Sequence, residues 1–436
     1  MARLLIKGGK PLIGNVEVSG SKNSSQALLA AAALADGECV LENVSRGTAT
    51  ATMCLILRQL GARVFVDNAG NVHVDGTSIN RCEAPYELVR RERGSFYVAG
   101  LLLSRLGQAE VPLPGGCDIG PRPIDFHIRG FQQLGAQVNI EHGSLVATAN
   151  KMNGTSIFVG RSSVGATVNL MLAACKANGI TVLENAAKEP EIVDLAIFLN
   201  SMGARVRGAG TDAIRIEGVE RLSPAQHTTI PDRIEAGTFM MCTAITGGNV
   251  HIRNAEPEHL RLPILKLVEA GVQVIQDEGG VIVKSEGRLK ACDAETAPYP
   301  GFPTDFQQPF VSVMSIADGT SVIRETIFEN RWRWADELRR LGADIRVERD
   351  TAIIKGVNNL TGAPVQATDL RAGAALVVAA LAASGETAIY DADVIYRGYE
   401  HLSKKLNSLG ACISEDFSDT EENMSFWQLT EELDRC

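Results

Sequence analysis

The chain has 436 residues, which is too long for one hydrophobic core and predicts two or three domains. Its formal net charge of −10 argues against nucleic acid as a general partner. No apolar run reaches the roughly 18 residues that a membrane span needs, and the first residues lack the apolar stretch and cleavage site of a signal peptide. We therefore expect a cytoplasmic globular protein that uses neither a membrane nor nucleic acid.

Along the chain, one short motif recurs six times: QLGARV, QLGAQV, SMGARV, EAGVQV, RLGADI and SLGACI. Each copy follows a helix-like pattern and precedes an alternating, strand-like one, so its glycine is predicted to cap the C-terminus of a helix. Several copies continue into a short hairpin. The six glycines recur at intervals of about 70 residues, at Gly61, Gly135, Gly203, Gly271, Gly342 and Gly410.

Upstream of each motif lies a second helix-like stretch that is rich in alanine and other small residues, from SQALLAAAALADG in the first copy to AGAALVVAALAASG in the last. A helix that is apolar on most sides belongs in the centre of a domain. The predicted unit is a buried helix, a strand, an outer helix, the glycine cap and a hairpin. A period this long favours compact domains of three units, with a boundary at Pro231.

Polar or charged residues stand at the start of all six buried helices. Helix N-termini present free N–H groups and a partial positive charge, so they can bind anions. Ser163 and Asp305 could simply be helix caps. A cation is unfavourable at this end of a helix, which favours a functional role for the others. The full set is Lys22 with Asn23, Arg93, Ser163 with Gly165, Arg233, Asp305 and Arg371.

The nine cysteines form no CxxC pair, and their number is odd. We therefore expect no disulfide framework and no metal site. Cys117 differs from the other eight because it lies among glycines and prolines in VPLPGGCDIGPRP, residues 111–123. A loop of this composition can bring its backbone and thiol close to a ligand.

Nine motifs spread over almost the whole chain, from about Leu5 to about Ile413, resemble those of the enolpyruvyl transferases. In order they are VSGSKNS, LPGGCDIGPRPIDFHIRGFQQLGA, SSVGAT, ENAAKEPEIVD, PDRIEAGTF, GFPTDFQ, ETIFENR, ATDLRAGAALV and RGYE. The resemblance implies an α/β (α+β) fold. Six βαβαββ-type units would form two inside-out α/β barrel domains of three units each, with the active site in the interdomain cleft. The expected domains are residues 22–230, which carry the Cys117 loop, and residues 1–21 plus 231–436, with an acidic tail from about 417.

The likeness is greatest to the branch that acts on UDP-N-acetylglucosamine. It implies that the enolpyruvyl group of phosphoenolpyruvate moves to the 3-hydroxyl of the sugar by addition and elimination, with release of phosphate. This is the first committed step of peptidoglycan precursor synthesis. The expected partners are phosphoenolpyruvate and a uridine nucleotide sugar, and the resemblance implies no metal and no organic cofactor.

The resemblance also assigns catalytic roles. Cys117 matches the general acid, which can also form a covalent adduct with phosphoenolpyruvate. An ordinary thiol is mostly protonated at pH 7 and can therefore donate a proton. Lys22, Arg122 and Arg397 match the cations that hold phosphoenolpyruvate. Asp305 matches the residue that contacts the acceptor hydroxyl and is the candidate base, although it could instead only position that hydroxyl.

Further matches describe the nucleotide site. Arg122 to Phe126 match the uracil pocket, where Asp125 can accept a ring N–H. His127 and Arg161 to Gly165 match the diphosphate site, and Asn23 and Ile327 match sugar contacts. Other charged residues match the lining of the cleft or ion pairs between the domains: Glu189, Glu191, Asp232, Arg233, Arg331, Asp369 and Arg371. The candidate substrate-binding set is Lys22, Asn23, Arg93, Arg122, Pro123, Ile124, Asp125, Phe126, His127, Arg161, Ser163, Val164, Gly165, Asp305, Ile327, Arg331, Asp369, Arg371 and Arg397.

Three features depart from the family pattern. Ala49 and Ala51 stand where a charged stretch is usual, Asp118 follows the thiol where a small uncharged residue is commoner, and Trp332–Trp334 stand where a histidine-containing stretch is usual. Two alternatives therefore stay open: transfer to another uridine nucleotide such as UMP in nucleoside-antibiotic synthesis, or an inactive relative that acts as a binding protein. The shikimate branch of the superfamily is disfavoured because it lacks the Cys117 loop and the uracil motif.

Overall fold

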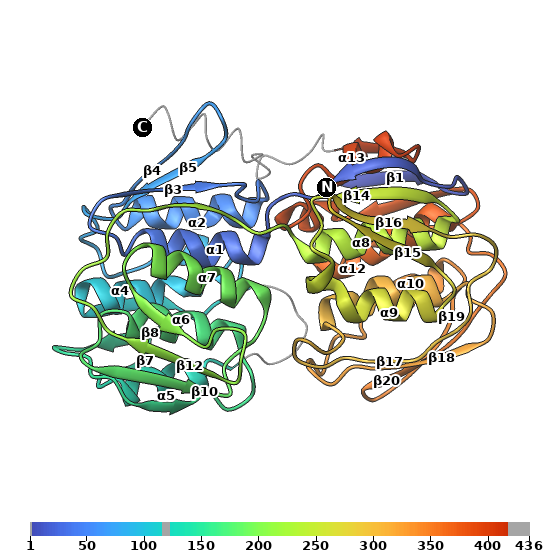
Figure 1. Ribbon diagram of the computed structural model, residues 1–436. Coiled ribbons are helices and arrows are strands. Elements are labelled where there is room, and N and C mark those ends of the chain that lie inside the picture. The colour runs from blue at the N-terminus through green and yellow to red at the C-terminus, as the bar shows by residue number, and fades with distance from the viewer. Residues whose placement is uncertain (1, 116–122, 417–436) are drawn as a thin grey trace. The chain divides into compact units, whose positions relative to one another are not determined.

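The computed structural model describes residues 2–115 and 123–416 (Figure 1). Cys117, Asp118, Arg122 and the acidic tail from residue 417 lie outside these ranges. The described residues divide into two compact units. The first unit comprises residues 20–115 and 123–230. The second unit comprises residues 2–19 and 231–416.

The first unit contains three copies of the predicted repeat. Each copy has a buried helix, a strand, an outer helix and a hairpin. The first copy is α1 (Lys22–Ala32), β3 (Glu38–Glu42), α2 (Thr48–Gln59), β4 (Arg63–Val66) and β5 (Val72–Asp75). The second is α3 (Tyr86–Val89), η1 (Gly94–Tyr97), α4 (Val98–Leu106), β6 (Gln108–Pro112), α5 (Asp125–Gln133), β7 (Gln137–Glu141) and β8 (Ser144–Thr148). The third is β9 (Ser156–Phe158), α6 (Val164–Ala174), β10 (Ile180–Glu184), α7 (Pro190–Ser201), β11 (Arg205–Arg207) and β12 (Ala213–Glu217), followed by β13 (Gln226–Thr228).

The second unit begins with β1 (Arg3–Lys7) and β2 (Ile13–Glu17) and then has three more copies. The fourth copy is α8 (Arg233–Thr246), β14 (Asn249–Arg253), η2 (Pro257–Leu260), α9 (Arg261–Glu269), β15 (Gln273–Asp277) and β16 (Gly280–Lys284). The fifth is β17 (Ala294–Glu295), α10 (Thr304–Met314), β18 (Thr320–Arg324), α11 (Ala335–Arg340), β19 (Asp344–Glu348) and β20 (Thr351–Lys355). The sixth is β21 (Pro364–Gln366), α12 (Leu370–Ala382), β22 (Glu386–Tyr390), η3 (Ala392–Arg397), α13 (Leu402–Ser408) and β23 (Cys412–Asp416).

The fold is of the α/β type, and the described strands form six separate sheets, one for each repeat. Sheet β11-β12-β10-β9 shows the common pattern, in which β9 runs parallel to β10 while β10, β12 and β11 are antiparallel neighbours. Within the described ranges no sheet closes on itself. The expected barrels are therefore not closed sheets, because every repeat keeps its own short sheet.

Three strands lie in the sheet of a repeat that is distant in sequence. β2 pairs in parallel with β14, and β13 pairs in parallel with β3. β1 lies between β22 and β23 and takes the place of a second hairpin strand in the sixth repeat. The chain therefore passes from one unit to the other twice, near Ser19 and near Ile230.

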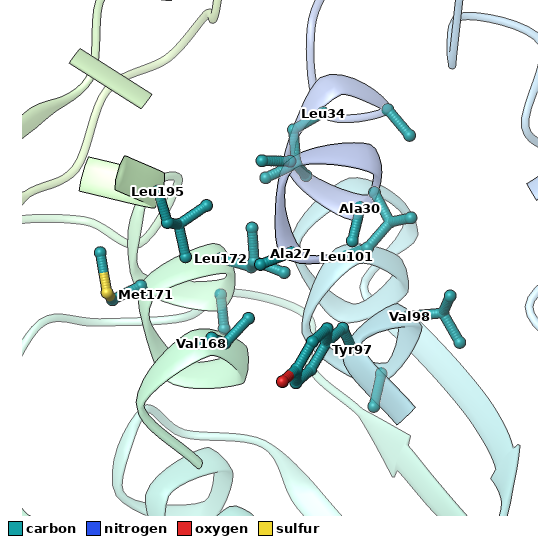
Figure 2. Close-up of a cluster of buried hydrophobic side chains, with 14 of the residues drawn as sticks. Ala27, Ala30, Leu34, Tyr97, Val98, Leu101, Val168, Met171, Leu172 and Leu195 are labelled. Atoms are coloured by element: carbon teal, nitrogen blue, oxygen red, sulfur yellow. The ribbon is translucent and has the colours of Figure 1, made fainter. Parts of the chain in front are cut away.

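The core of each unit is made by its alanine-rich helices, which are buried along most of their length, as predicted. In the first unit, Ala27 of α1, Leu101 of α4 and Leu172 of α6 lie in one cluster of buried side chains (Figure 2). Small residues let these helices approach closely. A Cβ atom on Gly100 of α4 would lie 2.4 Å from the backbone oxygen of Asn169 in α6. This close packing brings the N-terminal ends of the helices to fixed positions.

The six motif glycines have φ angles between +92° and +107°, so each is left-handed and follows the C-cap residue of an outer helix. This conformation favours glycine because it has no Cβ atom. The predicted helix caps are therefore confirmed.

Candidate active site

At the N-terminus of α1, Lys22 forms a largely buried ion pair with Glu92. Lys22 Nζ lies 3.0 Å from Glu92 Oε2, and the two side chains are 14% and 6% exposed. Ser21 caps the helix and accepts a hydrogen bond from the N–H of Ser24. Glu92 supplies the negative charge that offsets a cation at this end of a helix. Asn23 follows Lys22 and is half-buried.

The second candidate of the first unit is His127, a buried residue of α5. Burial and then the charge of Arg93 lower the pKa of His127 to about 3, so the ring is neutral at physiological pH. Its Nδ1 atom lies 3.1 Å from Asn169 Nδ2, and the ring of Phe96 packs edge-on against it. Arg93 is the residue before the short helix η1 rather than before a long helix.

The N-terminus of α6 lies beside this histidine. Ser163 caps the helix by accepting a hydrogen bond from the N–H of Ala166, so the cap interpretation of Ser163 is confirmed. A Cβ atom on Gly165 would lie 3.4 Å from His127 Nε2. The structure therefore brings His127 and Gly165 together. Val164 is half-buried and Arg161 is exposed.

The start of α5 carries the residues matched to the uracil pocket. Asp125 is the first residue of the helix, and its Oδ1 atom is buried without a hydrogen-bond partner among the described residues. Phe126 packs on Gly160, where a Cβ atom would come within 2.1 Å of the ring. Ile124 is buried and Pro123 is exposed. An unused acceptor oxygen suits recognition of a ring N–H.

In the second unit, the candidate residues gather around Asp305. Asp305 Oδ1 lies 2.8 Å from Arg331 Nη2, and its Oδ2 lies 3.1 Å from Arg371 Nη2. Asp305 is the second residue of α10 and lies within the helix rather than in a turn. Its side chain does not cap the helix, because the cap position is Pro303 and no side chain accepts a hydrogen bond there. The cap interpretation of Asp305 is therefore wrong.

The charges around Asp305 decide its protonation state. Burial alone would raise the pKa of this carboxyl group, but Arg371, Arg331 and Arg233 outweigh it and hold the pKa well below its usual range. Asp305 is thus a stable carboxylate and a weak proton acceptor in this arrangement. It is well suited to accept a hydrogen bond from a hydroxyl group and hold it in place.

A buried carboxylate, Glu325, holds the two motifs that carry this cluster. Glu325 Oε2 accepts a hydrogen bond from Thr304 Oγ1 at 2.8 Å, and its Oε1 accepts one from the N–H of Ile327 at 2.8 Å. Thr304 Oγ1 in turn accepts from Arg331 Nη1 at 3.0 Å. The start of α10 and the ETIFENR segment are therefore fixed to each other, and Ile327 is half-buried beside them.

The remaining cations are supported differently. Asp369 caps α12 by accepting from the N–H groups of Arg371 and Ala372, which compensates for the cation at this helix start. Asp232 caps α8 in the same way, directly before Arg233. Arg397 ends η3 and is half-buried, and residues 2–115 and 123–416 give it no side-chain hydrogen bond or ion pair.

Two of the three departures from the family pattern lie within the described residues, and their alanine and tryptophan side chains are buried. Ala49 and Ala51 are buried in α2. Trp332 and Trp334 are buried as well, and Trp332 Nε1 donates to the carbonyl of Asp350. Ala51, Trp332 and Trp334 belong to the hydrophobic cores of their units. Asp118 lies outside the described ranges.

Four residues that hold candidate site residues in place were not predicted from the sequence: Glu92, Asn169, Thr304 and Glu325. Thr304 and Glu325 belong to recognised motifs but are 21 residues apart, and Glu92 and Asn169 lie in no recognised motif. Among the described residues, no group of histidine, cysteine or acidic side chains could hold a metal ion. Within the same ranges, no helix is long and apolar enough to cross a membrane.

Comparison with known proteins matches these features to one family. The profile described as EPSP synthase (3-phosphoshikimate 1-carboxyvinyltransferase) matches residues 6–406. A UDP-N-acetylglucosamine 1-carboxyvinyltransferase of Symbiobacterium thermophilum is 53% identical over 94% of this chain and 97% of its own. A protein of the same name from Clostridium botulinum is 50% identical over 95% of this chain and 99% of its own length.

Solved structures agree with the fold. The enolpyruvyl transferase NikO from Streptomyces tendae matches with a TM-score of 0.85 and 27% identity, over 95% of this chain and 99% of its own. An EPSP synthase from Acinetobacter baumannii matches with a TM-score of 0.76 and 19% identity, over 95% and 100% of the two chains.

Proposed function

The chain belongs to the EPSP synthase family of enolpyruvyl transferases, and we propose that it transfers the enolpyruvyl group of phosphoenolpyruvate to UDP-N-acetylglucosamine. The acceptor atom is the 3-hydroxyl of the sugar, and phosphate is released. One observation carries this proposal: over nearly the full chain, about half of the residues are identical to those of relatives whose names state this activity. The likeness to NikO is much lower, at 27%.

In the addition step, Cys117 donates a proton to the methylene carbon of phosphoenolpyruvate and becomes a thiolate. The sugar oxygen forms a bond to the neighbouring carbon, which bears the phosphate, while the hydroxyl proton passes to water. In the elimination step, the Cys117 thiolate takes a proton back from the new methyl group, the carbon–oxygen bond to phosphate breaks so that phosphate leaves, and the double bond re-forms. Alternatively, the Cys117 thiolate forms a covalent adduct by adding to the carbon that bears the phosphate, while the methylene carbon takes a proton from water. Cys117 lies outside the described ranges, as does Arg122, one of the cations that bind phosphoenolpyruvate.

Cations stabilise the anionic groups of this reaction. Lys22, Arg122 and Arg397 bind the phosphate and carboxylate of phosphoenolpyruvate. Two opposite charges about 4 Å apart attract by roughly 4 kcal/mol at an effective dielectric constant near 20. Arg397 is half-buried and has no carboxylate partner among the described residues. Both features support a role in binding an anion. Lys22 already has Glu92 beside it, which fixes its ammonium group.

Asp305 accepts a hydrogen bond from the acceptor hydroxyl and orients it for attack. Its low pKa supports this positioning role over that of a strong base. Arg331 and Arg371 hold both carboxylate oxygens, so the carboxylate has a fixed direction. A carboxylate that is already held in place lowers the activation free energy more than a flexible one, because the entropy cost of orienting it was met when the protein folded.

The nucleotide is bound by residues of the first unit and a few of the second. Arg122 to Phe126 hold uracil, His127 and Arg161 to Gly165 hold the diphosphate, and Arg93 belongs to the substrate-binding set close to His127. Asn23 and Ile327 contact the sugar, and Asp369 supports Arg371. We further propose that residues 22–230 and the rest of the chain act as two domains of three repeats in the cytoplasm. The predicted cleft between the domains stays a prediction.

A phosphate-release assay tests this function. Phosphoenolpyruvate is incubated with the protein and UDP-N-acetylglucosamine, UMP, shikimate 3-phosphate or no acceptor. Phosphate release only with the sugar nucleotide supports the proposal. Release with UMP alone favours the alternative acceptor, and no release with any acceptor favours an inactive relative.

A further inference from the structure

The side-chain amide of Asn169 in α6 is completely buried and makes three hydrogen bonds. Its Oδ1 atom accepts from the N–H of Gly100 at 2.7 Å. Its Nδ2 atom donates to the carbonyl oxygen of Phe96 at 3.1 Å and lies 3.1 Å from His127 Nδ1. All of these groups belong to the first unit.

These bonds fix the orientation of the amide. The N–H of Gly100 can only donate and the carbonyl of Phe96 can only accept, so the oxygen and nitrogen of Asn169 cannot be exchanged. The hydrogen-bearing Nδ2 therefore faces His127 Nδ1. A good contact requires Nδ1 to be an acceptor, and the ring proton must then be on Nε2. A protonated ring would place two donors against each other, so this network also disfavours the charged form.

The other nitrogen of the ring faces the start of α6. A Cβ atom on Gly165 would lie 3.4 Å from His127 Nε2 and 3.5 Å from Cε1, which is ordinary contact distance. Gly165 therefore places no side-chain atom against this edge of the imidazole. The free N–H groups of the helix N-terminus begin at the same place, after the Ser163 cap. The nearby charge of Arg93 adds a further cost to protonating the ring.

We propose that Asn169 is a positioning residue that holds His127 in the neutral Nε2–H tautomer, and that Gly165 keeps this donor open to the diphosphate of the nucleotide. The inference rests on the proposed function for the identity of the ligand. Its consequence is that His127 recognises the diphosphate through a hydrogen bond and carries no counter-charge.

The first test is the tautomer itself, measured by ¹⁵N NMR of histidine-labelled protein without ligand. His127 is assigned by its loss in His127→Gln. The expected wild-type spectrum shows a protonated Nε2 and an unprotonated Nδ1, unchanged from about pH 8 to about pH 5. Asn169→Asp replaces the donor by an acceptor and should move a proton onto Nδ1. Asn178→Asp is the control for the same amide-to-carboxylate change, because this exposed amide also bonds a backbone carbonyl and a side chain, and neither belongs to a histidine. A wild-type His127 protonated on Nδ1 overturns the proposal.

The second test adds one methyl group over the donor. Gly165→Ala should lower the affinity for UDP-N-acetylglucosamine about tenfold in calorimetry, because a charge-assisted hydrogen bond is lost. The melting temperature should be unchanged. Gly279→Ala is the matched control in the second unit, since its Cβ atom would lie at similar distances, 3.6 Å from Asp277 Oδ1 and 3.7 Å from His251 Nε2. Wild-type affinity in Gly165→Ala overturns the role of Gly165. A wild-type protein that binds no UDP-N-acetylglucosamine overturns the proposed function instead, and the tautomer measurement still decides the role of Asn169.

Discussion

Arg331 Nη2 lies 2.8 Å from Asp305 Oδ1, and this contact joins the ETIFENR segment to the first turn of α10. The second oxygen of Asp305 faces Arg371 at 3.1 Å. Both arginines are buried, and Asp305 is 28% exposed. Asp305 therefore pairs with both buried arginines while part of its own side chain stays accessible to solvent. Its ion pairs support the view that it orients a hydroxyl group.

Asp305→Asn should lower the free energy of unfolding by about 3 kcal/mol at pH 7, because it leaves two buried guanidinium groups without their counter-charge. The pKa of Asp305 is lowered in the folded state. Its stabilising effect is therefore fully present above the unfolded-state pKa of about 3.9 and is lost as the pH falls below it. Urea denaturation at several pH values should show a constant difference above about pH 5 and a smaller one below about pH 4. Asp318→Asn, at an exposed ion pair, is the control. Equal effects of the two substitutions would contradict the account.

Arg105→Ala should destabilise the first unit by about 2–3 kcal/mol. Arg105 Nη1 lies 3.2 Å from each of three buried backbone oxygens after the end of α1, those of Ala33, Leu34 and Ala35. Buried acceptors without a donor are costly. Arg63→Ala removes an exposed arginine with two carboxylate partners and should cost less than about 1 kcal/mol. Thermal or urea unfolding measures both, and a larger effect at Arg63 would show that the carbonyl contacts of Arg105 contribute little.

Cys117→Ala should abolish phosphate release, while Cys117→Asp should retain some, because a carboxylic acid can also donate a proton. An epoxide analogue of phosphoenolpyruvate that alkylates thiols should inactivate the wild type and spare Cys117→Asp. Steady-state rates and the mass of the labelled protein measure these effects. Full activity in the alanine variant would remove Cys117 from the role of general acid.

Asn23→Ala should weaken the binding of UDP-N-acetylglucosamine by about 1–3 kcal/mol, which is the usual cost of a lost polar partner in a buried contact. The binding of UMP should be nearly unchanged, since UMP has no sugar at this position. Calorimetric titration with both nucleotides makes the comparison within one protein. A similar loss for both ligands would place Asn23 outside the sugar site.

Much of the fold could be predicted from the sequence because its signals are local. The left-handed glycines after the outer helices, such as Gly61 and Gly342, mark helix ends by their own backbone preference. The alanine-rich stretches predict buried helices for a similar reason, since each is apolar on most sides. Such features depend on residues that are close in sequence, so they can be recognised within a single repeat.

Two features could not be predicted in this way: the pairing of strands from distant repeats, and the residues that contact the candidate site residues. β2 pairs with β14 and β13 pairs with β3, although each lies far along the chain from its partner. Asn169 contacts His127 from 42 residues away, and Glu92, which pairs with Lys22, lies in the segment between α3 and η1. Asp305 could be mistaken for a cap because aspartate suits a helix start, whereas its real partners come from two distant segments. Tertiary packing decides these contacts.

The position of the transferred group tests the central claim most directly. The protein is incubated with UDP-N-acetylglucosamine and phosphoenolpyruvate carrying ¹³C at the carbon that bears the phosphate, and the product is examined by two-dimensional NMR. A correlation between the labelled carbon and the proton on C3 of the sugar is expected, with one phosphate released for each product molecule. A labelled carbon attached to any other position, or no product from this nucleotide while UMP is converted, would contradict the account.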